Sequence, residues 1–304
     1  MIHDRGHIET EKANAESASL DEMPILDAVQ LMNREDQRAV VAVGQQAPAI
    51  AQTVELVASA FRAGGRLIYV GAGTSGRLGI LDAAECPPTF SSDPRMVIGI
   101  IAGGPAAIER SIENVEDDAQ AGAQALRDIQ INTHDVVIGI AAGGTTPFVH
   151  GAIAEARKCG SKTIFLSCTR REHISVDADI FICVETGPEI LTGSTRLKAG
   201  TAPELVLNTI STLAMTHIGK VYGNTMVDVD CLKNSKLIDR GTRIIMRITG
   251  INRTDAAALL QQAHGKVKRA IVMHMRQCDA QTAEQLLTQS AGFLRQAIRP
   301  SSDS

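Results

Sequence analysis

A glycine- and hydroxyl-rich turn, Gly71-Ala72-Gly73-Thr74-Ser75-Gly76, has residue types and spacing that suit an anion. It follows the short apolar run Leu67–Val70, which predicts a buried strand, and a helical apolar pattern resumes at Leu78. In the order strand, turn, helix, free backbone N–H groups and the positive end of the helix dipole meet at one place. Thr74 and Ser75 add hydroxyl donors without bulk. The turn therefore predicts phosphate binding, and the alternative is a turn that only packs a helix on a sheet.

The same glycines also fit the dinucleotide-binding spacing G-x-G-x-x-G, which requires an acidic residue after the next strand. The next apolar run, however, ends in Ala102-Gly103-Gly104, with no acid there. A second glycine-hydroxyl loop, Gly143–Thr146, follows the predicted strand Asp135–Ala141. Ligands of parallel sheets bind outside the carboxyl ends of the strands. Two such loops at comparable strand–helix junctions favour a phosphate site over packing alone.

A third polar segment, Glu189–Ala202, lies just before the apolar helical pattern Glu204–Ile218. It carries the hydroxyl of Ser194 and the cations Arg196 and Lys198. The segment predicts a basic lip that meets an anionic ligand. The alternative is a solvated loop that caps the helix.

Two acids lie near these loops along the chain. Glu85 stands at the end of the helix predicted from Ser75, ahead of Pro87-Pro88, where we expect that helix to stop. Glu116 lies in an acidic run, and the residues alone do not distinguish it from Glu113 or Asp117 as a functional group. Each acid, taken alone, is more often an exposed charge than a catalytic group.

Composition excludes several classes of function. A net charge of -4, a pI near 6.1 and 3% aromatic residues over 304 residues argue against nucleic-acid partners. Eight histidines form no metal-ligand or hydrolase spacing, so we expect no metal site and no nucleophilic hydrolase. Six scattered cysteines without a C-x-x-C pair are typical of reduced thiols in a cytoplasm, and we expect no membrane segment or signal peptide.

The remaining pattern is an alternation of strands and helices. The strands are expected at Leu67–Val70, Met96–Ala102, Asp135–Ala141, Lys162–Cys168 and Asp179–Val184, and the helices near Ser75–Glu85, Pro105–Val115 continuing to about Arg127, and Pro147–Cys159. Unalternating apolar strands predict an α/β fold with a parallel sheet covered on both faces.

The regions before and after this alternation are predicted to be helical, apart from the first residues. Residues 1–20 are polar and predict a mobile arm. A helix is expected over Asp21–Val43, interrupted at Asn33–Asp36, and a second opens at Pro48. Past Asp239 three helical periods predict a compact three-helix appendage.

Together these motifs resemble a known family. The stretch YVGAGTSGRLGILDAAECPPTF, with IAGG at Ile101–Gly104, VEDD at Val115–Asp118 and EILTGSTRLKAGTA, is similar to the N-acetylmuramic acid 6-phosphate etherases of the sugar isomerase (SIS) superfamily. The resemblance covers nearly the whole chain and implies an SIS-type five-stranded parallel sheet flanked by helices. It also implies a homodimer with sites near the subunit boundary. The implied domains are 1–46 as arm and helix, 47–238 as the SIS domain and 239–304 as a small, ubiquitin-associated-like helical domain.

The resemblance implies cleavage of the lactyl ether of N-acetylmuramic acid 6-phosphate to N-acetylglucosamine 6-phosphate and lactate during cell-wall recycling. The family's two catalytic carboxylates correspond to Glu85 and Glu116. Two positioned carboxyls suffice for such an elimination without metal or cofactor. The implied substrate-binding residues are Gly73, Thr74, Ser75, Gly76, Arg77, Gly143, Gly144, Thr145, Thr146, Ser194, Arg196 and Lys198.

The chain departs from the family pattern at two places. The second loop carries Gly143 where the family usually has Ser, and Thr169-Arg170 follows the fourth strand where Asn-Pro is common. Two other functions stay open from the sequence. One is a phosphosugar-sensing regulator without catalysis, like the glucokinase regulatory protein, and the other is an aldose–ketose phosphosugar isomerase. A single SIS domain and the retained Glu85 favour the etherase.

Overall fold

The computed structural model describes residues 6, 8–229, 231 and 235–299. The chain divides into two compact units, and each is described by itself. Unit 1 comprises Met1–Ala84 and Pro94–Ser211, and unit 2 comprises Glu85–Asp93 and Thr212–Ser304. The domain boundary that the sequence predicts at residue 239 falls within unit 2, because the second stretch of unit 2 begins at Thr212.

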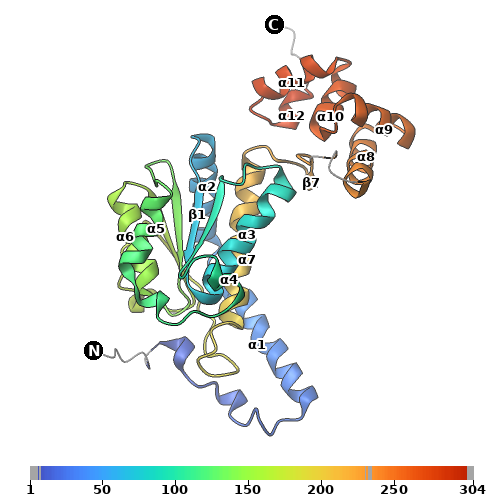
Figure 1. Cartoon of the computed structure of the whole chain (residues 1–304). Helices are drawn as coiled ribbons and strands as arrows, with labels where there is room; N and C mark the ends of the chain where they lie inside the picture. The colour runs from blue at the N-terminus through green and yellow to red at the C-terminus, as the bar shows by residue number, and fades with distance from the viewer. Residues whose placement is uncertain (1–5, 7, 230, 232–234, 300–304) are drawn as a thin grey trace. The chain divides into compact units, whose positions relative to one another are not determined.

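Unit 1 is built on a five-stranded parallel sheet, as expected (Figure 1). The strand order is β2-β1-β3-β4-β5. The strands are β1 (Leu67–Gly71), β2 (Val97–Ile101), β3 (Val136–Ile140), β4 (Lys162–Ser167) and β5 (Ile180–Cys183). The central strands β1 and β3 are buried along their whole length, which explains their unbroken apolar sequences.

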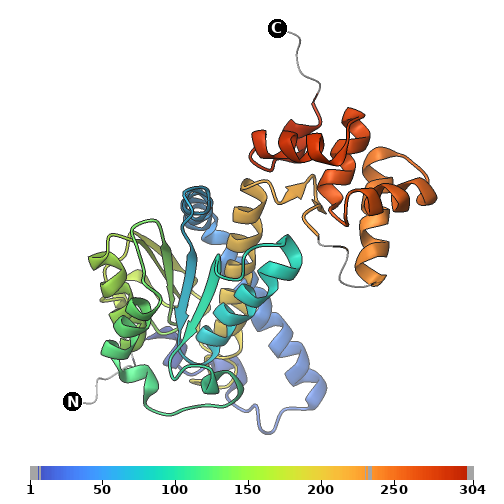
Figure 2. The same ribbon diagram turned by 45° about the horizontal axis from the view of Figure 1, so that its top comes forward.

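Helices cover both faces of the sheet. Helices α5 (Ala119–Asp128) and α6 (Pro147–Lys158) lie on one side, and α3 (Gly73–Phe90) and α7 (Lys198–His217) lie on the other (Figures 1 and 2). Glycines permit the close contact. A Cβ on Gly139 would lie 2.7 Å from Val149 of α6, and a Cβ on Gly79 of α3 would lie 2.7 Å from Tyr69 Cβ.

Two predicted helices differ from the structure. Helix α3 does not stop at Pro87-Pro88 but continues to Phe90, where Ser91 N donates to Pro87 O at 2.9 Å. The predicted helix from Pro105 is instead split into α4 (Ala106–Glu109), a 3-10 turn η3 (Val115–Asp117) and α5. The break has a backbone cause, since Asn114 is left-handed at φ 65° and Asp118 accepts from Ala121 N to begin α5.

The expected interruption at Asn33–Asp36 is also wrong. Helix α1 (Ile25–Gln45) runs through it without a break, followed by α2 (Ala47–Arg62). Glu35 is 1% exposed and faces the protein, where its carboxylate pairs with Lys198 and with Arg38. Glu35, whose charge interrupts the apolar pattern of the sequence, therefore lies on the buried side of α1.

Part of the predicted mobile arm is packed. Residues 1–5 and 7 lie outside the described residues, but Ile8, Thr10 and Ser17 are buried. We call Ile8–Ser17 the amino-terminal strap. It contains the 3-10 turns η1 (Glu9–Glu11) and η2 (Ala15–Ser17) and passes beneath the sheet at the strand ends (Figures 1 and 2). Side-chain hydrogen bonds and the apolar Ile8 hold a segment that its polar composition does not predict to be ordered.

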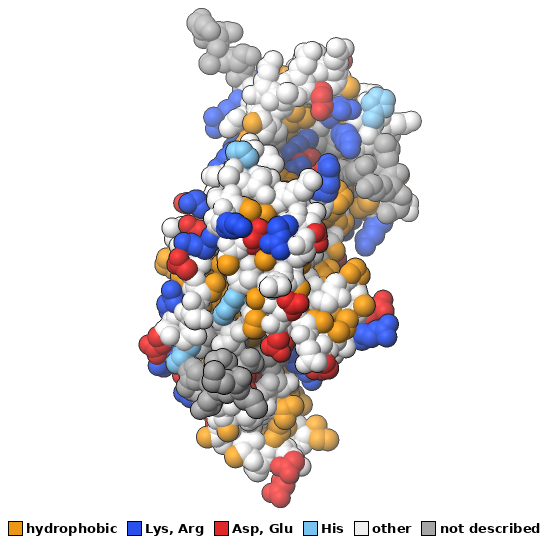
Figure 3. Space-filling model, turned by 60° about the vertical axis from the view of Figure 1, so that its left-hand side comes forward, with side chains coloured by type: hydrophobic (Ala, Val, Ile, Leu, Met, Phe, Trp, Pro, Cys, Tyr) orange, Lys and Arg blue, Asp and Glu red, His pale blue; other side chains and the backbone are white. Residues whose placement is uncertain are grey.

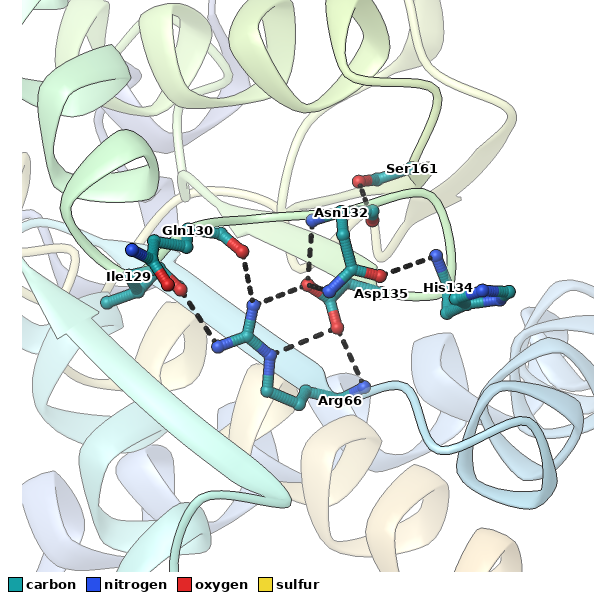
Figure 4. Close-up of polar contacts among 7 residues, drawn as sticks. All are labelled: Arg66, Ile129, Gln130, Asn132, His134, Asp135 and Ser161. Atoms are coloured by element: carbon teal, nitrogen blue, oxygen red, sulfur yellow. Dashed lines mark hydrogen bonds and ion pairs between the residues drawn. The ribbon is translucent and has the colours of Figure 1, made fainter.

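The amino-terminal edge of the sheet is tied by one carboxylate, Asp135, which is 1% exposed. It accepts from Arg66 N (2.9 Å), Arg66 Nε (3.1 Å) and Arg66 Nη2 (2.6 Å), and from Asn132 N and Nδ2 (Figure 4). The remaining guanidinium donors reach Ile129 O and Gln130 O. This network joins the starts of β1 and β3 at the edge opposite the glycine loops.

Unit 2 is helical, with more elements than the expected three. Its described elements are the hairpin β6 (Val221–Tyr222) and β7 (Thr225–Met226), and the helices α8 (Ser235–Thr249), α9 (Arg253–Gln262), α10 (Val267–Arg276), α11 (Ala280–Gln289) and α12 (Leu294–Ala297). They share one apolar core that includes Ile245, Leu260 and Ile271. None of the described helices is both long and apolar enough for a membrane span.

Candidate active site

The carboxyl ends of β1, β2 and β3 are level with one another. Gly71 pairs in register with Ile101 on one side and with Ile140 on the other. The loops that follow these three strands therefore start at the same edge of the sheet. The expectation that the glycine-hydroxyl loops share this edge is confirmed.

The β1–α3 turn is closely packed at its glycines. A Cβ on Gly71 would lie 2.6 Å from Gly76 N, and a Cβ on Gly76 would lie 2.6 Å from Ile101 Cγ1. Helix α3 begins at Gly73, whose φ is 52°, so Thr74 and Ser75 occupy its first turn, where backbone N–H groups have no helical acceptor. This geometry supports the anion-binding interpretation of the turn.

The second loop has the same construction at the start of α6. Gly144 has φ 77°, and a Cβ there would lie 3.1 Å from both Ile174 and Thr169. Thr146 is the N-cap of α6 but its side chain makes no cap hydrogen bond, so the hydroxyl is free of that role. His150 Nε2 lies 2.8 Å from Gly144 O and braces the loop.

The predicted basic lip is divided between a buried cation and an exposed one. Lys198 is 1% exposed and ion-pairs with Glu35 of α1, whereas Arg196 is exposed and Ser194 half-buried. Glu189 accepts from Lys198 N (3.1 Å) and Ala199 N (2.9 Å) and so caps α7. Burial raises the pKa of Glu189, and these backbone donors oppose the rise. The segment thus combines both alternatives, a capped helix start and an exposed cation.

Arg77 also has protein partners. Its Nε donates to Ile108 O at 2.9 Å and its Nη2 to Arg110 O at 3.2 Å. These bonds hold the carboxyl end of α4 and its C-cap, Arg110, against the start of α3.

The two candidate catalytic acids, Glu85 and Glu116, lie at different distances from the glycine-hydroxyl loops. Glu116 is exposed in η3, and η3 packs at the end of β2, since a Cβ on Gly103 would lie 3.3 Å from Val115 Cγ2. Glu85 is exposed ten residues beyond Ser75 in α3, which at ~1.5 Å per residue is about 15 Å along the helix. Within one chain, Glu116 therefore lies at the edge of the sheet that carries the glycine-hydroxyl loops, whereas Glu85 does not.

Sequence reasoning missed Asp82, which the structure buries in the middle of α3. Its carboxylate accepts from Tyr69 Oη (2.7 Å) and from Ser211 Oγ (2.8 Å). Burial raises the pKa of Asp82, and these two hydrogen bonds lower it again in part. The signal in the sequence is Tyr69 itself, because a tyrosine in an apolar strand needs a partner for its hydroxyl.

Within the described residues, no three His, Cys, Asp or Glu side chains gather as metal ligands would. Residues 49–157 match the family model of the glucokinase regulatory protein N-terminal SIS domain. This match and the sheet described above define the class: unit 1 contains an SIS domain, as expected.

Full-length relatives narrow the class to a family. This chain is 50% identical over 295 residues to a protein of Picosynechococcus sp., covering 97% of this chain and 98% of that one. It is 53% identical to a Synechococcus elongatus protein (98% and 96% covered) and 52% identical to a Gloeobacter violaceus protein (98% and 97% covered). All three are named N-acetylmuramic acid 6-phosphate etherase. The chain belongs to the N-acetylmuramic acid 6-phosphate etherase family.

Solved structures resemble only part of the chain. A phosphoheptose isomerase from Francisella tularensis is 19% identical and covers 64% of this chain and 100% of its own, with a TM-score of 0.49. A second, from Neisseria gonorrhoeae, is 16% identical with the same coverage and a TM-score of 0.48. Neither carries weight for the activity.

Proposed function

We propose that this protein is a carbon–oxygen lyase that cleaves the lactyl ether of N-acetylmuramic acid 6-phosphate. The products are N-acetylglucosamine 6-phosphate and D-lactate, and the reaction serves cell-wall recycling and amino sugar catabolism. The single observation that carries the proposal is about 50% identity to etherases over nearly the full length of both chains. The two glycine-hydroxyl loops at one sheet edge support it, because they suit a sugar phosphate.

The reaction follows from acid–base chemistry. In the open-chain sugar the C1 aldehyde acidifies the proton on C2. A carboxylate removes that proton, the C3–O bond breaks, and a carboxylic acid gives its proton to the departing lactate oxygen. Water then adds at C3 of the unsaturated aldehyde. We assign Glu85 as the acid for lactate and Glu116 as the group at C2, and no step requires a metal or cofactor.

Substrate binding is assigned to the loop residues of the same edge. Backbone N–H groups and hydroxyls at Gly73–Gly76 and Gly143–Thr146 bind the phosphate, with Ser194 and the exposed Arg196 at the rim. Arg77 donates to Ile108 O and Lys198 ion-pairs with Glu35, so we assign these two residues to positioning the segments around the site.

We further propose that the protein is a homodimer in which Glu85 serves the partner's loops. A hexose 6-phosphate carries its phosphate only a few bonds from C2 and C3, whereas Glu85 lies about 15 Å along α3 from Ser75 of its own chain. A second copy resolves this mismatch, and closed two-fold dimers are the commonest assembly of soluble proteins.

Helix α1 supports the dimer. It buries one stripe, including Leu31 and Ala39, and exposes a second apolar stripe of Ile25, Val29 and Val40, with exposed fractions of 84%, 57% and 56%. In Figure 3 hydrophobic side chains are exposed at the lower end, the height at which Figure 1 draws the start of α1. A second copy is the occupant we assign to this stripe.

We place the enzyme in a reducing cytoplasm. None of the six cysteines, all of which are among the described residues, forms a disulfide, and Cys86, Cys168 and Cys231 are buried. Disulfide pairing therefore has no part in this fold, as is usual for proteins of that compartment.

The decisive test incubates the purified protein with N-acetylmuramic acid 6-phosphate, with and without EDTA, and measures lactate. We expect lactate in both samples. Glu85→Gln and Glu116→Gln should each lower kcat at least ~100-fold, the usual minimum for general acid–base catalysis. Glu113→Gln, from the same exposed acidic run, is the matched control and should keep wild-type turnover.

Other outcomes would replace the proposal. Tight sugar-phosphate binding without lactate would identify a sensor, and formation of a ketose from another phosphosugar would identify an isomerase. Near-normal turnover in Glu116→Gln with a loss in Glu113→Gln would move the base to Glu113.

A further inference from the structure

The amino-terminal strap is attached to the segment Glu189–Ala202, which leads into α7. Ser17 Oγ donates to Ile190 O at 2.7 Å, a contact between positions 173 apart in the chain. A Cβ on Gly193 would lie 3.7 Å from Glu11 Oε2. The strap is therefore part of the wall around the candidate phosphate site.

Thr10 is the strap residue that faces the second glycine-hydroxyl loop. It is fully buried, with 0% exposure. Its hydroxyl has no hydrogen-bond partner among the described residues. A Cβ on Gly143 would lie 3.9 Å from Thr10 Oγ1 and 4.0 Å from Thr145 Oγ1. The hydroxyl of Thr10 in the strap and the hydroxyl of Thr145 in the loop therefore both lie close to Gly143.

Burial of a hydroxyl without a partner costs free energy, so packing alone does not explain a threonine here. Valine has the same shape and would fill the site without an unsatisfied group. A ligand oxygen beside Gly143 would supply the missing partner, and Gly143 leaves room because it has no side chain.

The charges around the strap are paired with one another, and Arg170 is shared among Glu9, Glu172 and Glu185. Glu9 lies beside three basic side chains, with Lys12 Nζ at 3.0 Å, His173 Nε2 at 3.6 Å and Arg170 Nε at 3.9 Å. Burial raises the pKa of Glu9, but the hydrogen bonds from Lys12 and from the backbone N–H of Glu9, together with the charges of Lys12 and Arg170, lower the pKa overall. The negative charge of Glu9 is thereby balanced on the protein.

We propose that the Thr10 hydroxyl donates a hydrogen bond to a phosphate oxygen of the sugar phosphate bound at Gly143–Thr146. Thr10 is then a substrate-binding residue supplied by the amino-terminal strap. The inference rests on the proposed phosphosugar site but not on ether cleavage, because it concerns binding alone.

The test measures equilibrium binding by calorimetry with two probes, N-acetylglucosamine 6-phosphate and inorganic phosphate. Thr10→Val should weaken both by the same factor, about 10- to 100-fold, as expected for one hydrogen bond to a charged group. Thr10→Ser should bind as the wild type does, since it keeps the hydroxyl. Thr10→Val should also unfold at the same or a higher temperature, because it removes the unsatisfied group.

Two further variants sharpen the test. Thr53→Val is the matched control, because Thr53 is equally buried but its hydroxyl donates to Ala49 O within α2, and it should leave both affinities unchanged. Gly143→Ser in the Thr10→Val background should restore part of the affinity. Gly143 is not left-handed, so a serine fits and places a hydroxyl beside the same ligand.

Unchanged affinities in Thr10→Val would overturn the assignment, and a loss for the sugar phosphate but not for inorganic phosphate would move the contact to the sugar. A wild type that binds neither probe would overturn it together with the phosphosugar site. A wild type that binds both probes but releases no lactate would refute the etherase and leave the Thr10 assignment standing.

Discussion

At the scale of single residues, Asp82 and Glu85 illustrate how one helix gives two carboxylates different environments. They are neighbouring positions on α3, less than one turn apart, yet Asp82 is buried on Tyr69 and Ser211 while Glu85 is exposed. The buried acid is a structural one, and the exposed one is the acid that we assign to catalysis. Proximity in the sequence motif therefore says little about shared roles.

Asp82 should make stability depend on pH. Burial raises the pKa of Asp82 in the folded protein above the value of ~3.9 in the unfolded chain. As pH rises, Asp82 therefore ionises first in the unfolded chain. The unfolding free energy then decreases until the pH has passed the pKa of the folded state. Below both values the two states hold the proton equally. Asp82→Asn removes this dependence, so its unfolding free energy relative to the wild type should rise between pH 4 and pH 7, measured by urea denaturation.

Asp128→Asn is the control, because Asp128 is exposed on α5 of the same unit and has no comparable burial. A constant difference between Asp82→Asn and wild type across the pH range would contradict the pKa direction.

At the scale of elements, the Glu35–Lys198 pair links α1 to the start of α7 across 163 positions of the chain. Both side chains are 1% exposed, so removing one partner leaves the other charge buried. We expect Glu35→Leu to cost about 3 to 5 kcal/mol in unfolding free energy. The double variant Glu35→Leu/Lys198→Met should recover much of the loss, and a double-mutant cycle in urea measures it.

Additive effects of the two substitutions would show that the pair does not act as a unit. Lys198→Met alone should cost less than Glu35→Leu, because Glu35 keeps Arg38 at 2.6 Å.

The Asp135 network should hold the opposite edge of the sheet. Asp135 accepts hydrogen bonds from several N–H groups of Arg66 and Asn132. In Asp135→Asn one of the two accepting oxygens becomes an amide NH2 group, which can only donate. A loss of about 3 to 5 kcal/mol is expected, since the guanidinium of Arg66 loses its buried partner. Asp177→Asn is the matched control at an exposed pair with Arg157, and should cost about 1 kcal/mol or less.

Much of the fold was predictable because its signals are local. The strands were found from apolar runs, and the anion-binding turns from glycines and hydroxyls at strand ends. The helix through Asn33–Asp36 was not, because Glu35 is buried only by virtue of Lys198, far away in the sequence. The break after α4 depended on left-handed Asn114, which no periodicity reveals.

The candidate site was predictable in part for the same reason. The loops Gly73–Gly76 and Gly143–Thr146 were identified from sequence, and the structure places both strand ends at one edge. The sequence does not reveal Thr10, because its proposed role depends on its position beside Gly143, which is far away along the chain. Lys198 was taken for a free cation, and only tertiary structure reveals its partner.

At the scale of the whole molecule, the separation of Glu85 from the loops of its own chain predicts complementation between inactive subunits. Glu85→Gln and Glu116→Gln are each expected to be inactive alone. In a mixed dimer one site combines an intact Glu116 with the partner's intact Glu85. Random mixing gives half heterodimers with one working site each, so about a quarter of wild-type lactate release should return.

Co-refolding the two variants and assaying lactate tests this directly. No recovery, with heterodimers demonstrated by differently sized tags, would place Glu85 and Glu116 in the same subunit's site. A monomer in light scattering would overturn the dimer itself.

The Ser17–Ile190 hydrogen bond has a consequence for biosynthesis. The strap is synthesised before the surface that receives it, because Ile190 lies 173 positions after Ser17. At ~5 to 20 residues per second that interval is roughly 10 to 35 s. The hydrogen bond between Ser17 and Ile190 can therefore form only after that interval, although the strap itself has already been synthesised.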